Sequence, residues 1–530
     1  MELILSNEGL KDRASWETKG YQLPQYDRAA MVANTKANPT WIHFGAGNIF
    51  KAFQCAAVQK LLNDGTLDKG VIAVERVKKG EDTHDGLTVA VTLKANGTVE
   101  KAVIGSIAET VYLYGDEARM AEIFSAPSLQ MASFTITEKG YATRTPAGEL
   151  TQDITDDIAA GPAAAKTYMG KVAALLLARF NAGALPIAMV SMDNCSHNGD
   201  KLYSAITTVV DGWAANGLVS ADFVSYIKDA SKVSFPWSMI DKITPSPDLS
   251  VGAILEEDGL HGFAPVRNAR GTVTAPFVNA EETEYLVIED SFPNGRPALE
   301  KAGIYFTTRE TVDLVERMKV TTCLNPLHTA LAVYGCLLGY KRICEEMKDE
   351  DLVALIKQVG YVEGMPVVEN PGILDPKEFI DAVINVRLPN PFMPDAPQRI
   401  ATDTSQKIPV RYGETIKKYM ATGRDMSALK LSPLVLAGWL RYLMAVDDEG
   451  NEFTLSPDPL LEVLCPVVQQ IRLGEDADVN AVLEPILSNA NIFGVSLYEA
   501  GLADKVCGYF TELTAGPGAV RATLKKYTHA

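Results

Sequence analysis

The feature that most constrains the fold is a Gly-x-Gly turn between an apolar run and an amphipathic segment. The apolar run covers residues 40–44, Gly45 and Gly47 follow it, and the amphipathic segment continues to about Leu62. This order predicts a strand, a tight turn and a helix, which is how a dinucleotide-binding unit begins. Gly45 would permit the turn, and Gly47 would let a pyrophosphate approach the helix N-terminus, where N–H groups and the helix dipole favour anions.

One part of the dinucleotide-binding pattern is missing. Phe50 stands where a third glycine is usual, and Ala52 comes two residues later. A strand-turn-helix corner without a nucleotide therefore remains an alternative. The residues of this turn that we predict to contact the cofactor are Gly45, Ala46, Gly47, Asn48 and Ile49.

A second apolar run, residues 70–74, ends in Glu75. An acidic residue at this place would accept hydrogen bonds from the adenosine ribose and repel a 2′-phosphate, which favours NAD over NADP. The neighbouring Arg76 leaves NADP open. A solvated strand end is the alternative interpretation of Glu75.

Composition narrows the possible functions. At 530 residues the chain exceeds the size of a single core, so two domains are expected. A formal charge of -18 argues against a nucleic-acid or anionic-membrane partner. Seven scattered cysteines without a Cys-x-x-Cys pair predict reduced thiols and no zinc site. Since neither a secretion signal nor a membrane-spanning apolar stretch is evident, we expect a cytoplasmic protein.

The order of elements predicts an α/β class for the first half. Residues 87–93 and 99–107 flank Asn96-Gly97 and predict a β-hairpin, an antiparallel insertion in a parallel sheet. Strands and helices then alternate, with strands expected at residues 131–137 and 186–192 and helices at residues 163–180 and 200–216. Such alternation predicts a Rossmann-like, doubly wound domain.

The second half is expected to be mostly α-helical. We predict a Rossmann-type NAD-binding domain over residues 1–300, with an N-terminal extension that wraps the sheet, and a helical substrate-binding and catalytic domain over residues 301–530. Long apolar-periodic segments support the helical assignment. They cover residues 311–347, 351–359, 376–386, 413–420, 434–446, 460–470 and 477–488.

Six ordered landmarks make the chain resemble the long-chain polyol dehydrogenases, the family of mannitol dehydrogenase and of fructuronate and tagaturonate reductases. The landmarks are residues 45–49, 137–141, 193–199, 235–245, 288–297 and the run 319–328, which holds a lysine, an asparagine and a histidine. The resemblance implies a Rossmann-type N-terminal domain, a helical C-terminal domain, NAD as cofactor and chemistry without a metal. It also implies that Thr137 and Glu138 contact the cofactor.

The resemblance assigns Lys319 as general acid/base, Asn194 and Asn325 as amide donors to the reacting oxygen, and His328 as the residue that orients lysine or substrate. These roles fit the chemistry, because oxidation of an alcohol needs a base for the hydroxyl proton and a donor for the developing alkoxide. A lysine acts as base where burial or a neighbouring cation lowers its pKa.

Each of these residues also has a plain structural interpretation. Asn325 before Pro326 is a usual helix start, with asparagine as the cap. His328 could be a core histidine whose hydrogen bonds are satisfied. Because an isolated lysine on a helix is most often solvated, the role of Lys319 depends mainly on the resemblance.

The chain departs from the family pattern by one extra residue between the lysine and the asparagine. At about 100° per residue, nine residues place Lys319 and His328 on opposite sides of a regular helix, whereas eight leave them roughly 80° apart. Pro326 also lacks the N–H that would bond to Thr322 in a continuous helix. We therefore predict a π-bulge or kink between Lys319 and Asn325.

The resemblance also assigns Asp241, Arg399 and Lys407 to the substrate. Arg399 can hold a carboxylate with two parallel hydrogen bonds and Lys407 adds a point charge, while a surface ion pair is the alternative. Glu316, three residues before Lys319, corresponds to a glutamate that the family associates with a proton path to solvent. An intrahelical ion pair with Lys319 is equally open.

We expect an NAD-dependent oxidoreductase of a hexuronate pathway that interconverts D-fructuronate and D-mannonate. The insertion after Lys319 and the two downstream cations favour a uronate substrate. Tagaturonate reductase and mannitol or another polyol dehydrogenase are alternatives within the family. From other classes, a sugar-acid epimerase with tightly held NAD or a non-catalytic sugar-acid sensor stays open, and net release of NADH would distinguish the dehydrogenase from the epimerase.

Overall fold

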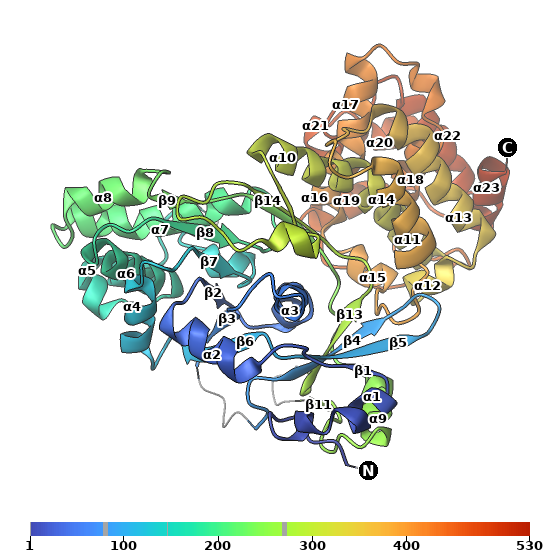
Figure 1. The fold of residues 1–530 in the computed structure, drawn as a ribbon. Coiled ribbons are helices and arrows are strands. Elements are labelled where there is room, and N and C mark those ends of the chain that lie inside the picture. Colours follow the sequence, from blue (N-terminus) through green and yellow to red (C-terminus); the bar gives the residue numbers. More distant parts are fainter. Residues whose placement is uncertain (1, 78–82, 146, 268–272, 530) are drawn as a thin grey trace. The chain divides into compact units, whose positions relative to one another are not determined.

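The computed structural model describes residues 2–77, 83–145, 147–267 and 273–529. The chain divides into two compact units (Figure 1). Unit 1 consists of Met1–Lys94 and Thr98–Asp313, and unit 2 of Ala95–Gly97 and Leu314–Ala530. The division predicted from the sequence lies after residue 300.

Unit 1 is built on a six-stranded sheet in which every neighbouring pair is parallel. Its order, β6-β3-β2-β7-β8-β9, runs outward from β2 in both directions, which is the doubly wound Rossmann arrangement. The strands are β2 (Trp41–Phe44), β3 (Val71–Glu75), β6 (Ile107–Tyr112), β7 (Met131–Phe134), β8 (Ile187–Ser191) and β9 (Val233–Ser234). The predicted fold class of this half is confirmed, and the topological switch point lies between β2 and β7.

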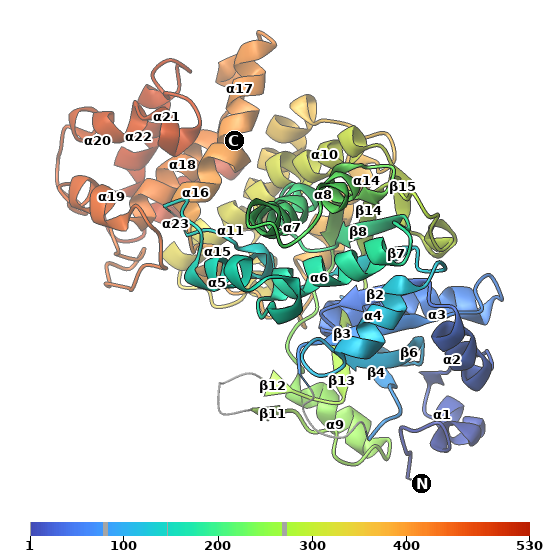
Figure 2. The same ribbon diagram turned by 90° about the vertical axis from the view of Figure 1, so that its left-hand side faces the viewer.

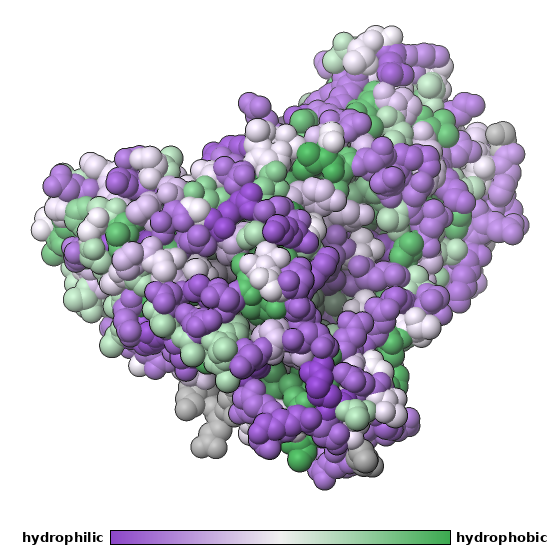
Figure 3. Space-filling view, viewed as in Figure 1, coloured by the Kyte–Doolittle hydropathy of each residue, from purple (hydrophilic) through white to green (hydrophobic). Residues whose placement is uncertain are grey.

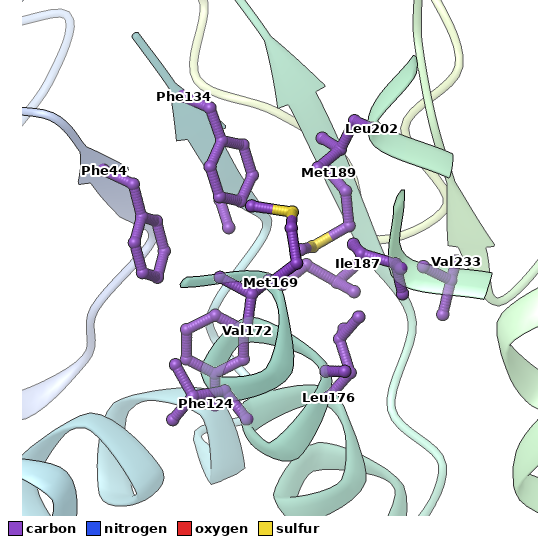
Figure 4. Packing of buried hydrophobic residues seen from close by; sticks show 14 of the residues in the cluster. Phe44, Phe124, Phe134, Met169, Val172, Leu176, Ile187, Met189, Leu202 and Val233 are labelled. Atoms are coloured by element: carbon purple, nitrogen blue, oxygen red, sulfur yellow. The ribbon is translucent and has the colours of Figure 1, made fainter. Parts of the chain in front are cut away.

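The strands of this sheet are buried on both faces, because successive side chains point in opposite directions. In β2, Ile42 and Phe44 enter one apolar cluster, and Trp41 enters the cluster on the other face. Figure 4 shows part of the first cluster, in which the rings of Phe44 and Phe134 stack with centroids 4.8 Å apart. This two-sided burial explains why the strands appear in the sequence as continuous apolar runs.

Helices cover both faces of the sheet (Figure 1, Figure 2). The cluster around Phe44 is covered by α4 (Glu117–Ser125), α5 (Gln152–Ala160), α6 (Tyr168–Asn181), α7 (Asn198–Ala215) and α8 (Ala221–Lys228), and the opposite cluster by α2 (Arg28–Ala37) and α3 (Cys55–Asn63). Helix α6 begins later than the expected residue 163. The reason is its cap, since the Thr167 hydroxyl accepts the N–H of Gly170 at 3.0 Å.

A second, four-stranded sheet has the order β1-β5-β4-β13. Its strands are β1 (Tyr21–Gln22), β4 (Thr88–Leu93), β5 (Val99–Ile104) and β13 (Phe277–Glu281). The predicted hairpin is confirmed as the antiparallel pair β4 and β5. Its expected insertion into the parallel sheet is wrong, because β4 pairs with β13 and β5 with β1 from the N-terminal extension. The run expected to end at residue 107 stops at Ile104, and Ile107 begins β6.

The rest of unit 1 consists of short elements. A three-stranded sheet has the order β10-β14-β15, and β11 pairs with β12. The bounds are α1 (Arg13–Thr18), β10 (Ser238–Asp241), α9 (Leu249–Glu257), β11 (Val266–Arg267), β12 (Val273–Thr274), β14 (Tyr285–Glu289) and β15 (Tyr305–Thr307). Helix α10 (Arg309–Met318) begins in unit 1 and continues into unit 2.

Unit 2 is helical, as predicted. Its helices are α11 (Asn325–Leu337), α12 (Ile343–Glu346), α13 (Glu350–Lys357), α14 (Pro376–Ala382), α15 (Pro397–Ile400), α16 (Thr404–Ile408), α17 (Glu414–Ala421), α18 (Leu431–Tyr442), α19 (Leu461–Val468), α20 (Val479–Leu487), α21 (Ala490–Phe493), α22 (Ala503–Leu513) and α23 (Ala519–Thr528). The helices that the sequence did not predict are α15, α16, α21, α22 and α23. The long segment expected over residues 311–347 is interrupted after Met318 and again after Leu337.

Two helices form the centre of unit 2. Every residue of α18 is buried, as are most residues of α11, which explains why both are apolar on all sides. They pack closely at Gly438, where a Cβ atom would meet the Tyr334 ring at 2.7 Å. The Tyr334 hydroxyl also donates a hydrogen bond to the Leu434 carbonyl at 2.8 Å.

The described helices are all too short or too polar to cross a membrane. Hydrophilic residues predominate on the face drawn in Figure 3. The large apolar side chains that are exposed, such as Leu249 and Val463, lie far apart in the sequence.

Candidate active site

The predicted glycine turn lies at the carboxyl end of β2. Gly45 has a φ of +97°, and a Cβ atom at this residue would lie 2.2 Å from the Thr135 carbonyl oxygen, so only glycine fits. The helix that follows starts at Asn48 and contains a π-helical segment, η2 (Phe50–Gln54), in its first turns. Phe50, at the place of the missing third glycine, is fully buried and stacks on the His43 ring with centroids 4.0 Å apart. The wider π turn thus accommodates a side chain where the usual pattern needs glycine.

A directed chain of hydrogen bonds supports this turn. The Trp41 indole donates to the Ser133 hydroxyl at 2.6 Å. The Thr135 hydroxyl gives its one hydrogen to the Gly45 carbonyl at 2.8 Å, so it accepts from His43 Nε2, which lies 2.9 Å away. In a neutral ring His43 Nδ1 is then an acceptor, and the Ser133 hydroxyl, 2.6 Å away, donates to it. Burial lowers the pKa of His43 to about 3, so the ring stays neutral and the chain keeps its direction.

The glycine turn lines a cavity of about 980 Å³ in unit 1. Its walls come from the ends of β2, β3 and β7, the switch-point crevice where Rossmann sheets bind dinucleotides. A Cβ atom on Gly47 would meet no protein atom closer than the Gly45 carbonyl oxygen at 3.9 Å, so space remains beside the helix start. The residues present therefore fit a dinucleotide.

Most residues predicted to contact the cofactor line this cavity, namely Gly45, Ala46, Gly47, Glu75 and Thr137. Three others are not among its lining residues. Asn48 is half-buried, Ile49 packs against an apolar cluster, and Glu138 forms an ion pair with Lys201.

The cavity wall also contains residues that sequence reasoning missed. Tyr114, just beyond β6, lies between two cations, with Arg76 5.6 Å and Lys171 5.1 Å from its ring centre. Its hydroxyl donates to the Lys166 carbonyl at 2.9 Å. The only available signal was the end of β6, and no strand is predicted from the sequence for residues 108–112.

Two predicted substrate-side residues belong to unit 1. Asn194 is exposed in the turn between β8 and α7, and Asp241 is the buried last residue of β10. Lys319, Asn325 and His328 belong to unit 2. The predicted set is therefore divided between the two units.

Lys319 begins a π-helical segment, η6 (Lys319–Cys323), between α10 and α11. The N–H of Leu324 donates to the Lys319 carbonyl at 3.1 Å, a step of five residues, and Pro326 follows in the first turn of α11. The predicted π-bulge between Lys319 and Asn325 is confirmed. The Lys319 residue is only 5% exposed, so it is not on a solvated face.

Asn325 does not cap α11. The cap position belongs to Leu324, which has no side-chain cap bond, and Asn325 is the first residue of the helix. Its carbonyl accepts a hydrogen bond from Arg411 Nη1 at 3.3 Å, and the same nitrogen lies 2.6 Å from Thr329 Oγ1. The plain capping interpretation of Asn325 therefore does not hold.

His328 lies beside a carboxylate. Its Nε2 is 3.4 Å from Asp395 Oδ2, and Asp395 also forms an ion pair with Arg399. Burial lowers the pKa of His328, with Arg411 and Arg387 acting in the same direction and Asp395 opposing them. Although burial opposes ionisation of Asp395, His328 and Arg399 hold its pKa down at about 2. The result is a neutral imidazole beside an ionised carboxylate.

Lys407 is the second predicted cation of this region. Its Nζ donates to the carbonyls of Ile400, at 3.0 Å, and Thr402. Burial and then Arg411 lower its pKa to about 8. Arg387, Arg399, Lys407 and Arg411 thus give unit 2 a group of cations near His328, in a chain whose net charge is -18.

Comparison with known proteins decides the family. Residues 39–301 match the model of the mannitol dehydrogenase Rossmann domain, and residues 311–508 match the model of the mannitol dehydrogenase C-terminal domain. The chain belongs to the mannitol dehydrogenase family. It is accordingly an oxidoreductase that acts on CH–OH groups, as predicted.

Several known proteins match most of this chain. A D-mannonate oxidoreductase of Thermotoga maritima is 51% identical over 98% of both chains. The D-mannonate oxidoreductase of Escherichia coli is 27% identical over 80% of this chain and 86% of its own. A solved structure of Pseudomonas fluorescens mannitol 2-dehydrogenase, a ternary complex with NAD and D-mannitol, is also similar. Its sequence is 27% identical to this chain, and the two structures superpose with a TM-score of 0.69 over 98% of this chain and 99% of that one. The similarity confirms the Rossmann and helical architecture.

Proposed function

We propose that the protein is an NAD-dependent D-mannonate oxidoreductase that interconverts D-fructuronate and D-mannonate. The observation that carries this proposal is the 51% identity to the D-mannonate oxidoreductase of Thermotoga maritima over 98% of each chain.

The dinucleotide is proposed to bind in the 980 Å³ cavity of unit 1, with Gly45 and Gly47 beside its phosphates and Glu75 beside its adenosine ribose. When bound, it supplies or accepts the hydride. The position of Glu75 at the end of β3 supports a preference for NAD over NADP.

Lys319 is proposed to hold the proton that the carbonyl oxygen gains on reduction and that the hydroxyl loses on oxidation. Its burial at the start of a π turn supports this role, because a solvated lysine would not be held in one position. The amide of Asn325, which the cap does not use, is proposed to donate to the reacting oxygen, as Asn194 is. His328, neutral beside Asp395, is proposed to orient the lysine or the substrate.

The cations of unit 2 support a uronate rather than a neutral polyol. Arg399 and Lys407 are proposed to bind the carboxylate, since a guanidinium and an ammonium both donate charge-assisted hydrogen bonds to it. Asp241 is proposed to accept a substrate hydroxyl. A cytoplasmic location is proposed as well, which the seven cysteines without a disulfide support.

The test follows NADH oxidation by absorbance with D-fructuronate, D-tagaturonate and D-fructose in parallel. The expected result is fast, stoichiometric oxidation with fructuronate and much slower reaction with the other two. Replacing NADH by NADPH tests the cofactor preference. Preference for fructose would favour a polyol dehydrogenase, and sugar-acid turnover without net NADH oxidation would favour an epimerase.

A further inference from the structure

The backbone at Thr137, on the wall of the dinucleotide cavity, has an unusual conformation. Its φ is +65° and its ψ is +160°, a region that glycine populates and residues with a Cβ atom avoid. Such strain persists only where surrounding contacts enforce it, and it occurs mainly at functional sites. The surroundings of Thr137 should therefore contain a group that holds it in place.

Asp193 provides that group. The N–H of Ile136 donates to its Oδ2 and the N–H of Thr137 to its Oδ1, both at 2.9 Å. The carboxylate thus binds two successive peptide groups, one on each oxygen. Since both donors belong to the segment that follows β7, Asp193 fixes the loop at the switch point of the sheet.

Asp193 also accepts hydrogen bonds from residues outside the Ile136–Thr137 segment. The Tyr141 hydroxyl donates to Asp193 Oδ2 at 2.5 Å, so the Ser191 hydroxyl, 2.8 Å from the Tyr141 oxygen, must donate to it. The Asp193 carbonyl accepts from Asn198 Nδ2 at 3.0 Å. Only 9% of Asp193 is exposed, and Tyr141 is buried. The position of the carboxylate is therefore set by hydrogen bonds from its own buried surroundings.

We propose that Asp193 is a positioning residue for dinucleotide binding: with Tyr141 behind it, its carboxylate holds the strained Ile136–Thr137 backbone in the shape that the cavity requires. This inference rests on the proposed function in so far as that function places NADH in this cavity. Asp193 does not touch the reacting atoms, and its effect reaches the cofactor through the backbone.

Glycine at residue 137 distinguishes a positioning role of Asp193 from a general effect on stability, because glycine adopts this backbone conformation without the hydrogen bonds to Asp193. NADH binding to the protein without sugar is measured by fluorescence titration. Asp193→Asn loses one charge-assisted acceptor and should weaken NADH binding by about tenfold to a hundredfold. In the Thr137→Gly background, the same Asp193→Asn change should weaken it by less than about threefold, because a glycine at this position adopts a positive φ unaided.

Asp448 in unit 2 offers a matched control. It is 8% exposed and also accepts two backbone N–H groups, from Val520 at 2.8 Å and Arg521 at 3.2 Å. Asp448→Asn should lower the melting temperature and leave NADH affinity unchanged. Should Asp193→Asn fail to fold, Tyr141→Phe provides the same test, with a smaller loss of NADH affinity and the same rescue by Thr137→Gly.

The pH dependence gives a second readout. Burial raises the pKa of Asp193, although hydrogen bonds from Tyr141, Ile136 and Thr137 oppose the shift. A protonated Asp193 holds the backbone less well, so wild-type NADH affinity should fall at acidic pH more than that of Asp193→Asn.

Two results would overturn the inference while the proposed function stands. In the first, Asp193→Asn lowers NADH affinity equally with threonine and with glycine at residue 137. In the second, Asp193→Asn does not lower NADH affinity. Failure of the wild-type protein to bind NADH would overturn both the inference and the proposed function.

Discussion

The candidate site residues of unit 1 and of unit 2 lie on different kinds of backbone structure. In unit 1, the candidate residues lie at or just after the ends of strands, and hydrogen-bond networks such as those of His43 and Asp193 fix the loops that follow. In unit 2, they lie on helices that π-helical segments interrupt. These segments are η6 (Lys319–Cys323), η7 (Gln358–Gly364), η9 (Val383–Arg387) and η10 (Pro409–Gly413).

The difference shows two ways of placing a reactive side chain. A loop after a strand is free to take the shape that a ligand needs, but it must be clamped. A π turn keeps the helix rigid and changes the direction in which one side chain points, as at Lys319. Nucleotide binding is therefore proposed for unit 1 and proton transfer for Lys319 of unit 2, so variants at the glycine turn or at Asp193 should leave proton transfer intact, and variants at Lys319 should leave nucleotide binding intact.

The largest expected effect is on turnover. Lys319→Ala should lower kcat by about 10² to 10⁴, because it removes the proposed proton donor. NADH affinity should stay within about twofold of wild type, since the nucleotide cavity belongs to unit 1. Steady-state kinetics and fluorescence titration measure the two quantities.

Lys505→Ala is the matched control for this variant. Lys505 is a partly buried lysine of unit 2, and its Nζ donates to the Leu429 carbonyl at 2.8 Å. Its replacement should affect stability more than kcat. A Lys319→Ala enzyme with near-normal kcat would exclude Lys319 as the acid.

The next effect is on nucleotide binding. Alanine variants at two glycines distinguish a loss of NADH affinity from a loss of stability. Gly45→Ala should weaken NADH binding by about a hundredfold and also lower the melting temperature, because its Cβ atom would lie 2.2 Å from the Thr135 carbonyl oxygen. Gly47→Ala should weaken NADH binding by about tenfold with an unchanged melting temperature, because its Cβ atom would project into open space. Unchanged NADH affinity in Gly47→Ala would contradict the proposed phosphate site.

A smaller effect concerns substrate choice in unit 2. Arg399→Ala should raise the KM for D-fructuronate by about tenfold, since one charge-assisted contact to the carboxylate is lost, and should leave the KM for D-fructose unchanged. Arg472→Ala, which removes an exposed arginine 4.0 Å from Glu475, is the control and should change neither. An equal rise in KM for both substrates would mean that Arg399 maintains the local structure and does not bind the carboxylate.

A separate prediction concerns stability rather than binding or turnover. Glu346 in α12 is fully buried, and neither of its carboxylate oxygens has a hydrogen-bond partner among the described residues. Burial raises its pKa to about 9. Because the unfolded chain releases this proton near the ordinary pKa of 4.5, the folded state loses stability as the pH rises from about 4.5 to about 9.

Glu346→Gln should therefore gain stability relative to wild type over this pH range, by up to roughly 1.4 kcal/mol per pH unit. Thermal unfolding at several pH values measures this difference. A constant difference between pH 5 and 8 would show that Glu346 has the same protonation state in the folded and unfolded chains, so that its pKa is not raised by burial.

Part of the fold follows from local sequence patterns. The strand-turn-helix at Gly45 needs only steric and dipole arguments, and the π turn at Lys319 follows from residue spacing together with Pro326. The second sheet could not be predicted in this way. β4 pairs with β13, nearly two hundred residues later, and no local pattern specifies such a partner.

The candidate site shows the same limit. Glycines and an acidic strand end identify the cofactor side, because their backbone requirements are local. Tyr114 and the Asp193 clamp depend on which loops the sheet brings together. The unusual φ of Thr137 has no sequence signal at all, since threonine is a poor residue for that conformation.

The most direct test of the account compares Lys319→Ala with Asp193→Asn in one experiment. NADH dissociation constants are measured by fluorescence, and the rate of the chemical step is measured by rapid mixing with D-fructuronate at saturating NADH. The account predicts a crossed pattern, in which Lys319→Ala loses the chemical step and keeps NADH affinity, while Asp193→Asn loses affinity and largely keeps the step. Two variants that lose both quantities in parallel would contradict the assignment of the two functions to the two units.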